Sequence, residues 1–339
     1  MARVALLGAS GYTGLEFLRL ARRHPGITIA ALASREWAGQ PAERLAPGLD
    51  SGPGGGRLPT IITPNAMAGL LASGDCDTLV SALPHGALKR LAAENPAWLE
   101  GPVRLLDLSS DWRDESLGFI YGLPERHRDR LRGATRVANP GCYPTAATLA
   151  ILPALDAGWV TGPVMVSALS GVTGAGRAAQ LRTSFAELSG SASFYKVGEV
   201  HAHVAEMTRN FAGVDADTTV SVAFAPALAP MSRGILATVS TPMAAPIDEA
   251  TARELWIARY ADEPFVTLLA AGEWPETRGV CGTNRVQVAV STVHGGRTLL
   301  ATAAIDNLVK GAAGQAIQNL NLMCGWPETT GLEIAAQPW

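Results

Sequence analysis

A cysteine in the middle of the chain lies where a protein nucleophile is typically found. Cys142 belongs to the segment Asn139–Thr145, which reads NPGCYPT and lies between a short apolar run at 135–138 and an apolar helical pattern at 146–152. The Pro-Gly pair indicates a turn, and Pro144 suits the first position of a helix, where an N–H group is not needed. The spacing therefore predicts a strand, a turn and the start of a helix, with Cys142 beside the positive end of that helix.

This predicted helix start gives the Cys142 thiol two chemical advantages. Unpaired backbone N–H groups and the positive end of the helix dipole favour the thiolate, which is the nucleophilic form. The same N–H groups suit the oxyanion that forms when a thiolate adds to a carbonyl. Cys142 is therefore a candidate catalytic nucleophile, and a buried structural cysteine is the alternative.

Two histidines two residues apart are the candidate proton carriers. His201 and His203 lie in a polar segment near residue 200. Beside a thiolate, a histidine stabilises the charge as an ion pair and exchanges a proton at neutral pH. An extended segment places both rings on one side, whereas a helix separates them. A surface or helix-capping role is the alternative, and metal binding is not expected because no Asp or Cys lies at a suitable short spacing.

The first residues of the chain carry the pattern of a dinucleotide-binding unit. A short apolar run at 3–7 is followed by a glycine-rich turn and by a helical pattern beginning at Leu15. Such glycines allow a tight turn and a close approach of the backbone to a pyrophosphate at the helix N-terminus, although an ordinary strand-to-helix loop is the alternative. Another apolar run ends at 83 and precedes a second helix start. The expected cofactor-binding residues are Gly8, Ser10, Gly11, Tyr12, Thr13, Gly14, Ser81 and Pro84.

The end of the second strand distinguishes between the two nicotinamide cofactors. The strand at 27–33 ends in Ser34 and Arg35, about 20 residues after the glycines, where an NAD-binding unit would have an acidic residue. A hydroxyl and a guanidinium suit a 2′-phosphate instead, because Arg presents a fixed fork of donors to phosphate. The sequence therefore predicts NADP, unless Arg35 is only a solvated loop charge beside Glu36.

Bulk properties exclude several classes of protein. The chain has 339 residues, of which 47% are hydrophobic and 17% charged, and its formal net charge is −3. A globular enzyme is expected, with no nucleic-acid partner, and the sequence lacks both a signal-peptide pattern and a membrane-length apolar run. Cys76, Cys142, Cys281 and Cys324 show no CxxC spacing, so neither a zinc site nor a disulfide framework is indicated. The expected compartment is the cytoplasm.

The order of strands and helices predicts an α/β fold with two domains. Strand and helix patterns alternate up to Cys142, which predicts a Rossmann-type doubly wound parallel sheet, with a Gly- and Pro-rich surface loop at 47–56. Longer alternating strands then indicate an α+β domain for substrate and dimerisation, with a large mixed sheet. The expected domains are 1–143 with a returning C-terminal segment 308–339, and 144–307. The second is expected to contain strands 164–169, 218–225, 234–241, 265–270, 284–292 and 298–304, and helices 145–156 and 248–260.

A cofactor-type domain combined with a cysteine on a strand-to-helix turn indicates a specific chemistry: a thiolate attacks an activated acyl group, and the thioester accepts hydride from NADPH. The chain resembles the semialdehyde dehydrogenase group and, within it, the N-acetyl-gamma-glutamyl-phosphate reductase family. The stretches that carry this resemblance are Gly8–Gly14, Ser81–Gly86, Asp107–Arg113, 121–125, Asn139–Thr145, Ser170–Arg177, His201–His203, 233–235 and 304–321.

The resemblance implies roles for individual residues. Cys142 would accept the acyl group, His203 would be the acid/base partner, and Asn307 would orient the nicotinamide. The implied substrate-binding residues are Arg113, Asn139, Arg177, Tyr195 and His201. The chain departs from the family at Ala202 and Ala205, where members commonly have Arg and Pro. The charge that grips the substrate would then come from Arg177, Arg182 or Arg233.

The implied function is the NADPH-dependent reduction of N-acetyl-L-glutamyl 5-phosphate to N-acetyl-L-glutamate 5-semialdehyde and phosphate in arginine biosynthesis. The same chemistry on aspartyl phosphate or a carrier-linked aminoadipyl phosphate is an open alternative. Another is a non-catalytic NADP-binding regulatory protein. The departures at Ala202 and Ala205 suggest it, and the presence of Cys142, His201 and His203 opposes it. Two large domains with a broad sheet indicate self-association as a homodimer or homotetramer.

Overall fold

A computed structural model describes residues 1–46, 48–49, 57–212 and 220–336. The chain forms two compact units. Unit 1 comprises Met1–Pro140 and Ala312–Ile334, and unit 2 comprises Gly141–Gly311 together with the residues from Ala335 onward. The expected boundaries at 143/144 and 307/308 therefore differ from the observed ones by three and four residues. Cys142 and Tyr143 belong to unit 2 because the helix that starts at Cys142 packs against the sheet of that unit.

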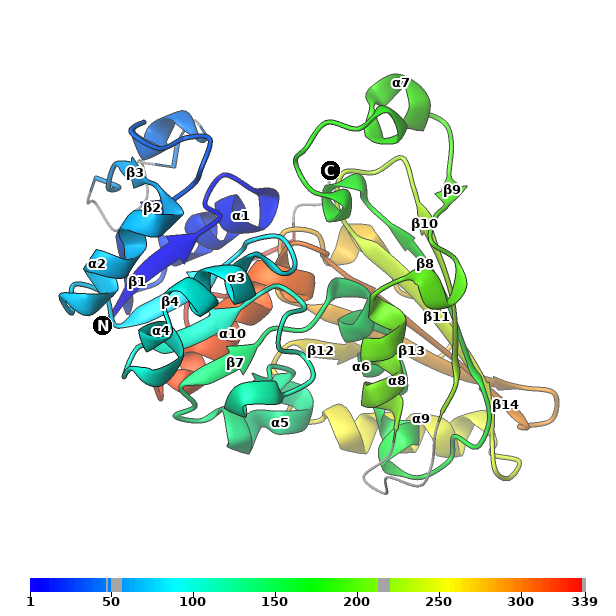
Figure 1. Cartoon of the computed structure of the whole chain (residues 1–339). Helices are drawn as coiled ribbons and strands as arrows, with labels where there is room; N and C mark the ends of the chain where they lie inside the picture. The colour runs from blue at the N-terminus through cyan, green and yellow to red at the C-terminus, as the bar shows by residue number, and fades with distance from the viewer. Residues whose placement is uncertain (47, 50–56, 213–219, 337–339) are drawn as a thin grey trace. The chain divides into compact units, whose positions relative to one another are not determined.

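Unit 1 is built on a seven-stranded parallel sheet with the order β3-β2-β1-β4-β5-β7-β6 (Figure 1). All four residues of β4 are buried, which is typical of a parallel strand covered on both faces. The predicted doubly wound sheet is thus confirmed. The strands are β1 (Ala2–Leu7), β2 (Ile27–Ala33), β3 (Ile61–Ile62), β4 (Thr78–Ser81), β5 (Arg104–Asp107), β6 (Ile120–Tyr121) and β7 (Arg136–Ala138).

The helices of unit 1 include one from the end of the chain. Helix α10 packs against α1 and α5, and every one of its side chains is buried. Its buried Asn319 donates from Nδ2 to Gly122 O at 2.8 Å and to Asn139 Oδ1 at 3.0 Å, so α10 holds the loops after two strands. The helices are α1 (Tyr12–Ala21), α2 (Met67–Ala72), α3 (Ala87–Glu94), α4 (Ala97–Glu100), α5 (Pro124–Leu131) and α10 (Gly314–Met323).

Unit 2 is built on a mixed seven-stranded sheet with the order β12-β13-β14-β11-β8-β10-β9, which confirms the predicted large mixed sheet. Two neighbouring pairs, β8/β10 and β12/β13, are parallel and the others are antiparallel. The strands are β8 (Val164–Ser170), β9 (Ser193–Phe194), β10 (Val222–Leu228), β11 (Ile235–Pro242), β12 (Val266–Leu268), β13 (Val286–Val293) and β14 (Thr298–Ile305).

Two strands of unit 2 have bounds that differ from those expected. The strand expected at 218–225 is β10, which begins only at Val222; residues 218–219 lie outside the described residues. The strand expected at 265–270 is shorter, because β12 pairs with β13 over only three residues, Val266–Leu268. The loop expected at 47–56 lies outside the described residues except for 48–49.

One face of the unit 2 sheet is packed and the other is open. Helices α6 (Cys142–Asp156), α8 (His203–Phe211) and α9 (Glu249–Tyr260) pack in unit 2, and α6 contacts β11, β13 and β14. Along β8, buried and exposed residues alternate strictly. Met165 and Leu169 point away from the packed face and are 51% and 40% exposed. The open face therefore presents apolar side chains to solvent.

Helix α6 is the central helix of unit 2. It is apolar on all sides, and all its residues from Tyr143 to Leu155 are buried, as expected for a helix surrounded by protein. From α9, Trp256 donates its indole N–H to Ala150 O at 3.0 Å, and Tyr260 donates its hydroxyl to Leu149 O. The helix that carries Cys142 is thus fixed by packing and by side-chain hydrogen bonds along its length.

Candidate active site

Cys142 is the first residue of α6. Gly141 precedes the helix in an extended conformation (φ −71°, ψ 155°), and Thr145 closes the first turn by donating its N–H to Gly141 O at 2.9 Å. The sequence-based placement of Pro144 at the first helical position is therefore wrong, because the helix begins two residues earlier and Pro144 is its third residue. This shift places the thiol directly on the helix start.

Few backbone donors remain at this helix start. A helix begins with four N–H groups that have no partner within it. Here the N–H of Gly141 donates to Glu206 Oε1 at 2.8 Å, and Pro144 has no N–H. The N–H groups of Cys142 and Tyr143 are the other two of the four, and they are the candidate donors to an oxyanion. Their contact with an oxyanion stays a prediction.

The two histidines lie beside the residue that follows Cys142. Their ring centroids are 4.9 Å apart, and Tyr143 packs edge-on against each ring at 5.9 Å. His203 is the first residue of α8, whereas His201 precedes the helix in an extended conformation. Because His201 is in an extended segment and only His203 is in the helix, the two rings stay close together.

His201 has the helix-capping role that the sequence left open as an alternative. Its Nδ1 accepts the backbone N–H of His203 at 3.2 Å, so it caps the start of α8. Burial of its ring, together with the charge of Lys196, lowers the pKa of His201 to about 4, against a weaker opposing effect of Glu206. His201 is therefore neutral at neutral pH, which leaves His203 as the better candidate for a proton carrier.

A pair of tyrosines extends the cluster. Tyr195, which the sequence placed in the substrate site, donates its hydroxyl to the hydroxyl of Tyr143 at 2.9 Å. The guanidinium of Arg182 lies over the ring of Tyr195 at 5.5 Å. Burial raises the pKa of Tyr195 to about 12, so its hydroxyl keeps its proton at neutral pH. Sequence reasoning missed Tyr143, although its place directly after Cys142 was a usable signal.

Arg113 and Asn139 are held by hydrogen bonds inside unit 1. Arg113 donates from Nε to Asn139 O at 2.8 Å and from Nη2 to Leu108 O at 3.0 Å. Asn139 donates from Nδ2 to Ala312 O at 3.2 Å and accepts from Asn319 at Oδ1. Both side chains thus stabilise the chain just before Pro140, and their contact with substrate stays a prediction.

The remaining predicted residues of unit 2 are distributed over three loops. Asn307 accepts the N–H of Gly234 at 2.8 Å and donates to Thr173 Oγ1 at 2.9 Å, so it joins two of these loops. Arg177 is exposed in the loop that follows β8. Arg233 forms an ion pair with the fully buried Asp306 at 3.3 Å. The charge of Arg233 is therefore already matched by a carboxylate of the protein.

The glycine-rich turn of unit 1 fits a dinucleotide. Gly8 has φ +79°, and an added Cβ there would lie 2.6 Å from Ala82 O. An added Cβ at Gly14 would lie 2.3 Å from Gly8 O, which is closer than real Cβ atoms come. Gly11 precedes α1, and Tyr12 and Thr13 are its first two residues. The turn is thus a cradle of bare backbone at a helix start, the shape that a pyrophosphate requires.

Polar groups suited to the rest of a cofactor lie at the ends of the neighbouring strands. Ser10 and Ser34 share a hydrogen bond of 2.8 Å between their hydroxyls, and Arg35 is exposed next to Ser34. The buried hydroxyl of Ser81, at the end of β4, has no hydrogen-bond partner among the described residues. Pro84 is exposed in the turn before α3. An orphaned buried hydroxyl at this edge is a suitable partner for a bound nucleotide.

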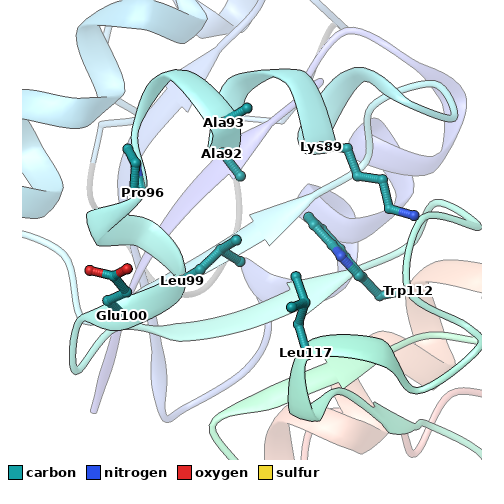
Figure 2. Close-up of a pocket in the computed structure, with 8 residues that line it drawn as sticks. All are labelled: Lys89, Ala92, Ala93, Pro96, Leu99, Glu100, Trp112 and Leu117. Carbon is teal, nitrogen blue, oxygen red and sulfur yellow. The ribbon is translucent and has the colours of Figure 1, made fainter.

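An open groove of about 310 Å³ lies elsewhere in unit 1, between α3, α4 and Trp112 (Figure 2). Figure 2 shows Lys89 extending beside the indole of Trp112, with Leu117 next to it. The residues that line it are Lys89, Ala92, Ala93, Pro96, Leu99, Glu100, Trp112 and Leu117. None of them is a predicted site residue, so this groove is separate from the groups that carry the chemistry.

The part of the chain that the structure describes shows neither a metal-binding cluster nor a membrane-spanning helix. Among the described residues, no group of three or more His, Cys, Asp or Glu side chains is arranged to hold a metal ion. None of the four cysteines, all of which the structure describes, forms a disulfide bond. Over the same ranges, no helix has the length and apolar character needed to cross a membrane.

Comparison with known proteins identifies relatives over nearly the whole chain. Residues 3–134 match the family model of the semialdehyde dehydrogenase NAD binding domain, and residues 142–307 match that of the semialdehyde dehydrogenase dimerisation domain. The N-acetyl-gamma-glutamyl-phosphate reductase of Halorhodospira halophila is 42% identical, and that of Saccharopolyspora erythraea is 41% identical, each over 98% of both chains.

Solved structures agree on the fold. Aspartate semialdehyde dehydrogenase II from Vibrio cholerae has a TM-score of 0.72 at 18% identity, covering 96% of this chain and 99% of that one. The aspartate semialdehyde dehydrogenase with NADP from Candida albicans has a TM-score of 0.68 at 16% identity, covering 96% and 98%. The chain belongs to the semialdehyde dehydrogenase family and, within it, to the N-acetyl-gamma-glutamyl-phosphate reductases.

Proposed function

We propose that this chain reduces N-acetyl-L-glutamyl 5-phosphate to N-acetyl-L-glutamate 5-semialdehyde and phosphate, with NADPH as the reductant, in arginine biosynthesis. The observation that carries the proposal is the placement of Cys142 on the first turn of α6, directly before Tyr143, whose ring packs against those of His201 and His203. The names of the relatives support the choice of acyl phosphate. Aspartyl phosphate and a carrier-linked aminoadipyl phosphate are the alternatives for the same chemistry, and the aspartate semialdehyde dehydrogenases of similar fold are only 18% and 16% identical.

The first half of the reaction is acyl transfer to sulfur. The thiolate of Cys142 attacks the acyl carbon, so that a C–S bond forms and the carbonyl oxygen becomes an oxyanion. The amides of Cys142 and Tyr143 donate to that oxyanion, which lowers the barrier. When the carbonyl reforms, the bond between the acyl carbon and the phosphate oxygen breaks. The products of this half are a thioester on Cys142 and inorganic phosphate.

The second half is reduction of the thioester to an aldehyde. Bound NADPH supplies the hydride. The same two amides hold the oxygen as it again becomes negative, and His203 donates a proton to it to give a thiohemiacetal on Cys142. His203 then takes the proton back as the C–S bond breaks, which releases the semialdehyde and restores the thiolate. The neutral His201 keeps the start of α8 in place throughout.

The anionic groups of the substrate need cations. Arg233 is paired with Asp306. Arg182 lies over Tyr195 and has no hydrogen bond or ion pair with another described residue, and Arg177 is exposed in the loop after β8. We assign the grip on the substrate carboxylate and phosphate to Arg182 and Arg177, which replace the charge that Ala202 does not supply.

The open face of the unit 2 sheet is the proposed contact between copies of the chain, as a homodimer or a homotetramer. Its support is the exposure of Met165 and Leu169 on a broad sheet in a region that matches a dimerisation domain. The proposed compartment is the cytoplasm, where glutathione and thioredoxin keep a catalytic thiol reduced.

Replacing the nucleophile tests the reaction directly. Cys142→Ala should abolish phosphate-dependent oxidation of N-acetyl-L-glutamate 5-semialdehyde and leave NADPH binding intact, because the thioester needs sulfur. Cys142→Ser should retain little activity, since a hydroxyl is barely ionised at neutral pH. Cys281→Ala is the matched control and should keep full activity. Turnover by Cys142→Ala, or faster alkylation of Cys281 than of Cys142 in the wild type, would contradict the mechanism.

Arg35 should discriminate between the two cofactors. In Arg35→Ala, NADPH affinity should fall by roughly ten- to a hundredfold, because a charge-assisted hydrogen bond to phosphate contributes about 1.5–3 kcal/mol. NADH lacks that phosphate, so its affinity should change little. Fluorescence titrations with both cofactors measure the effect, and the exposed Arg23→Ala on the same unit is the control. Equal weakening of NADPH and NADH would show that Arg35 does not recognise the phosphate.

The two histidines should differ in their pH dependence. His203→Asn should lower kcat by ~10²–10⁴-fold and remove one limb of the pH-rate profile. His201→Asn should keep that limb, because a group with a pKa of about 4 does not titrate between pH 6 and 8. The lowered pKa also means that the contribution of His201 to stability is complete above pH 6.5 and is lost as pH falls toward 4. The denaturation midpoint of His201→Asn should therefore fall less than that of the wild type as the pH is lowered from 6.5 to 4.

The kinetic result decides between the two histidines. If His201→Asn loses the limb of the pH-rate profile and His203→Asn keeps it, then His201 is the proton carrier.

A charge placed on the open face should separate the subunits. Leu169→Glu should yield a smaller species in light scattering coupled to gel filtration, because burying an unpaired carboxylate in an apolar interface is unfavourable. Ile257→Glu is the control, since Ile257 is equally apolar and 56% exposed but lies on α9. An unchanged mass for Leu169→Glu would place the interface elsewhere.

A further inference from the structure

Helix α6 is tied at its start by a residue from another helix. Within the described part of the chain, α6 has no side-chain N-cap of its own. Glu206 of α8 takes that place, because its Oε1 accepts the N–H of Gly141 at 2.8 Å across 65 positions of sequence. Glu206 is only 2% exposed and lies three residues after His203, on the same side of α8. One turn of α8 therefore carries both His203, the candidate proton carrier, and Glu206, which accepts a hydrogen bond from the residue before α6.

Cys142 is bounded on another side by a glycine. Residues Val309–Ala313 form a π-helical turn, in which Gly311 donates its N–H to Asp306 O at 2.9 Å. An added Cβ on Gly311 would lie 2.7 Å from the Cβ of Cys142 and 3.2 Å from its Cα. A Cβ cannot occupy that position unless Cys142 moves. The bare backbone of Gly311 thus rests directly on the nucleophilic residue, and π-turns of this kind are frequent at functional sites.

The π-turn is itself firmly anchored. Asp306 is fully buried, and its Oδ1 accepts the N–H groups of Leu308 at 2.7 Å and Val309 at 3.1 Å. Its Oδ2 accepts the N–H of Gly282 at 2.7 Å and pairs with Arg233 at 3.3 Å. With four bonds to one carboxylate, the turn is not free to retreat from an added methyl group, so Cys142 has to absorb the displacement.

We propose that Glu206 and Gly311 are positioning residues that hold the backbone of Cys142 from two sides and thereby set the direction of its sulfur relative to His203 and the substrate. The inference rests on Cys142 being the nucleophile of the proposed reaction. Its physical basis is that bond formation requires the reacting atoms in a narrow geometry, so that a displacement of about 1 Å costs ~10²-fold in rate.

The first test displaces Cys142 with a methyl group. Gly311→Ala should lower kcat by ~10- to 100-fold, with KM and NADPH affinity changed less than about twofold. The rate constant for alkylation of Cys142 by iodoacetamide should also change across its pH profile, since the thiol has moved against its neighbours. Gly69→Ala in α2 is the control, because an added Cβ there meets nothing within 4 Å. It should match the wild type in all these measurements.

The second test removes the hydrogen bond between Gly141 N–H and Glu206 at the start of α6. Glu206→Gln keeps an oxygen acceptor for the Gly141 N–H and should retain kcat within about threefold, whereas Glu206→Ala loses the acceptor and should lower kcat by ~10- to 100-fold. The double variant Glu206→Ala/Gly311→Ala should lose less than the product of the two single effects, because both act on the same residue. A thermal denaturation midpoint is measured for every variant.

Two results would overturn the inference. One is an unchanged kcat and alkylation profile in Gly311→Ala. The other is a loss of kcat that is equal in Glu206→Gln and Glu206→Ala and follows the loss of thermal stability, which is what a purely structural role predicts. The alkylation series needs no substrate, so it tests the positioning even if the wild type does not reduce N-acetyl-L-glutamyl 5-phosphate. That failure would instead overturn the proposed function.

Discussion

The start of α6 imposes the constraint on which the site depends. Any helix begins with four backbone N–H groups that require partners. In this chain the N–H of Gly141 donates to Glu206, Pro144 has no N–H, and the other two groups belong to Cys142 and Tyr143. A thiolate and an oxyanion are both stabilised by a helix start. In the proposed mechanism the same turn therefore orders the nucleophile and supplies the donors to the oxyanion.

Charge is distributed unequally around this turn. The buried carboxylates of Glu206 and Asp306 accept backbone N–H groups and hold segments in place. Arg177 and Arg182, in contrast, are exposed. In the proposed mechanism an anionic substrate would thus meet exposed cations at its carboxylate and phosphate, and fixed backbone dipoles at the reacting carbon. This division suits catalysis, because a preoriented dipole does not have to reorganise when charge develops.

Local patterns were sufficient for the features that local rules determine. The glycine turn, the alternation of strand and helix, and the strand-turn-helix context of Cys142 follow from short-range spacing, and the structure contains all of them. Contacts across many positions were not accessible in this way. The acceptor on Glu206 and the approach of Gly311 depend on how α6, α8 and the π-turn pack, and nothing in a single sequence marks them. The expected place of Pro144 differs by two residues because the first helical hydrogen bond runs from Thr145 N–H to Gly141 O, which starts the helix at Cys142, and helix ends are the least certain part of a sequence-based assignment.

Two successive capping hydrogen bonds connect His201 to the start of the helix that carries Cys142. Spacing alone allowed either ring to be the proton carrier and also allowed a capping role. In the structure His201 caps α8, which has no side-chain cap at Ala202 within the described residues. Helix α8 in turn supplies Glu206, which caps α6. His201 thus completes the start of α8, and Glu206 of α8 completes the start of α6, where Cys142 lies. Because burial lowers the pKa of His201, this cap stays neutral at the neutral pH at which the proposed mechanism requires His203 to exchange a proton. In that mechanism the ring that maintains the geometry takes no part in the proton transfer.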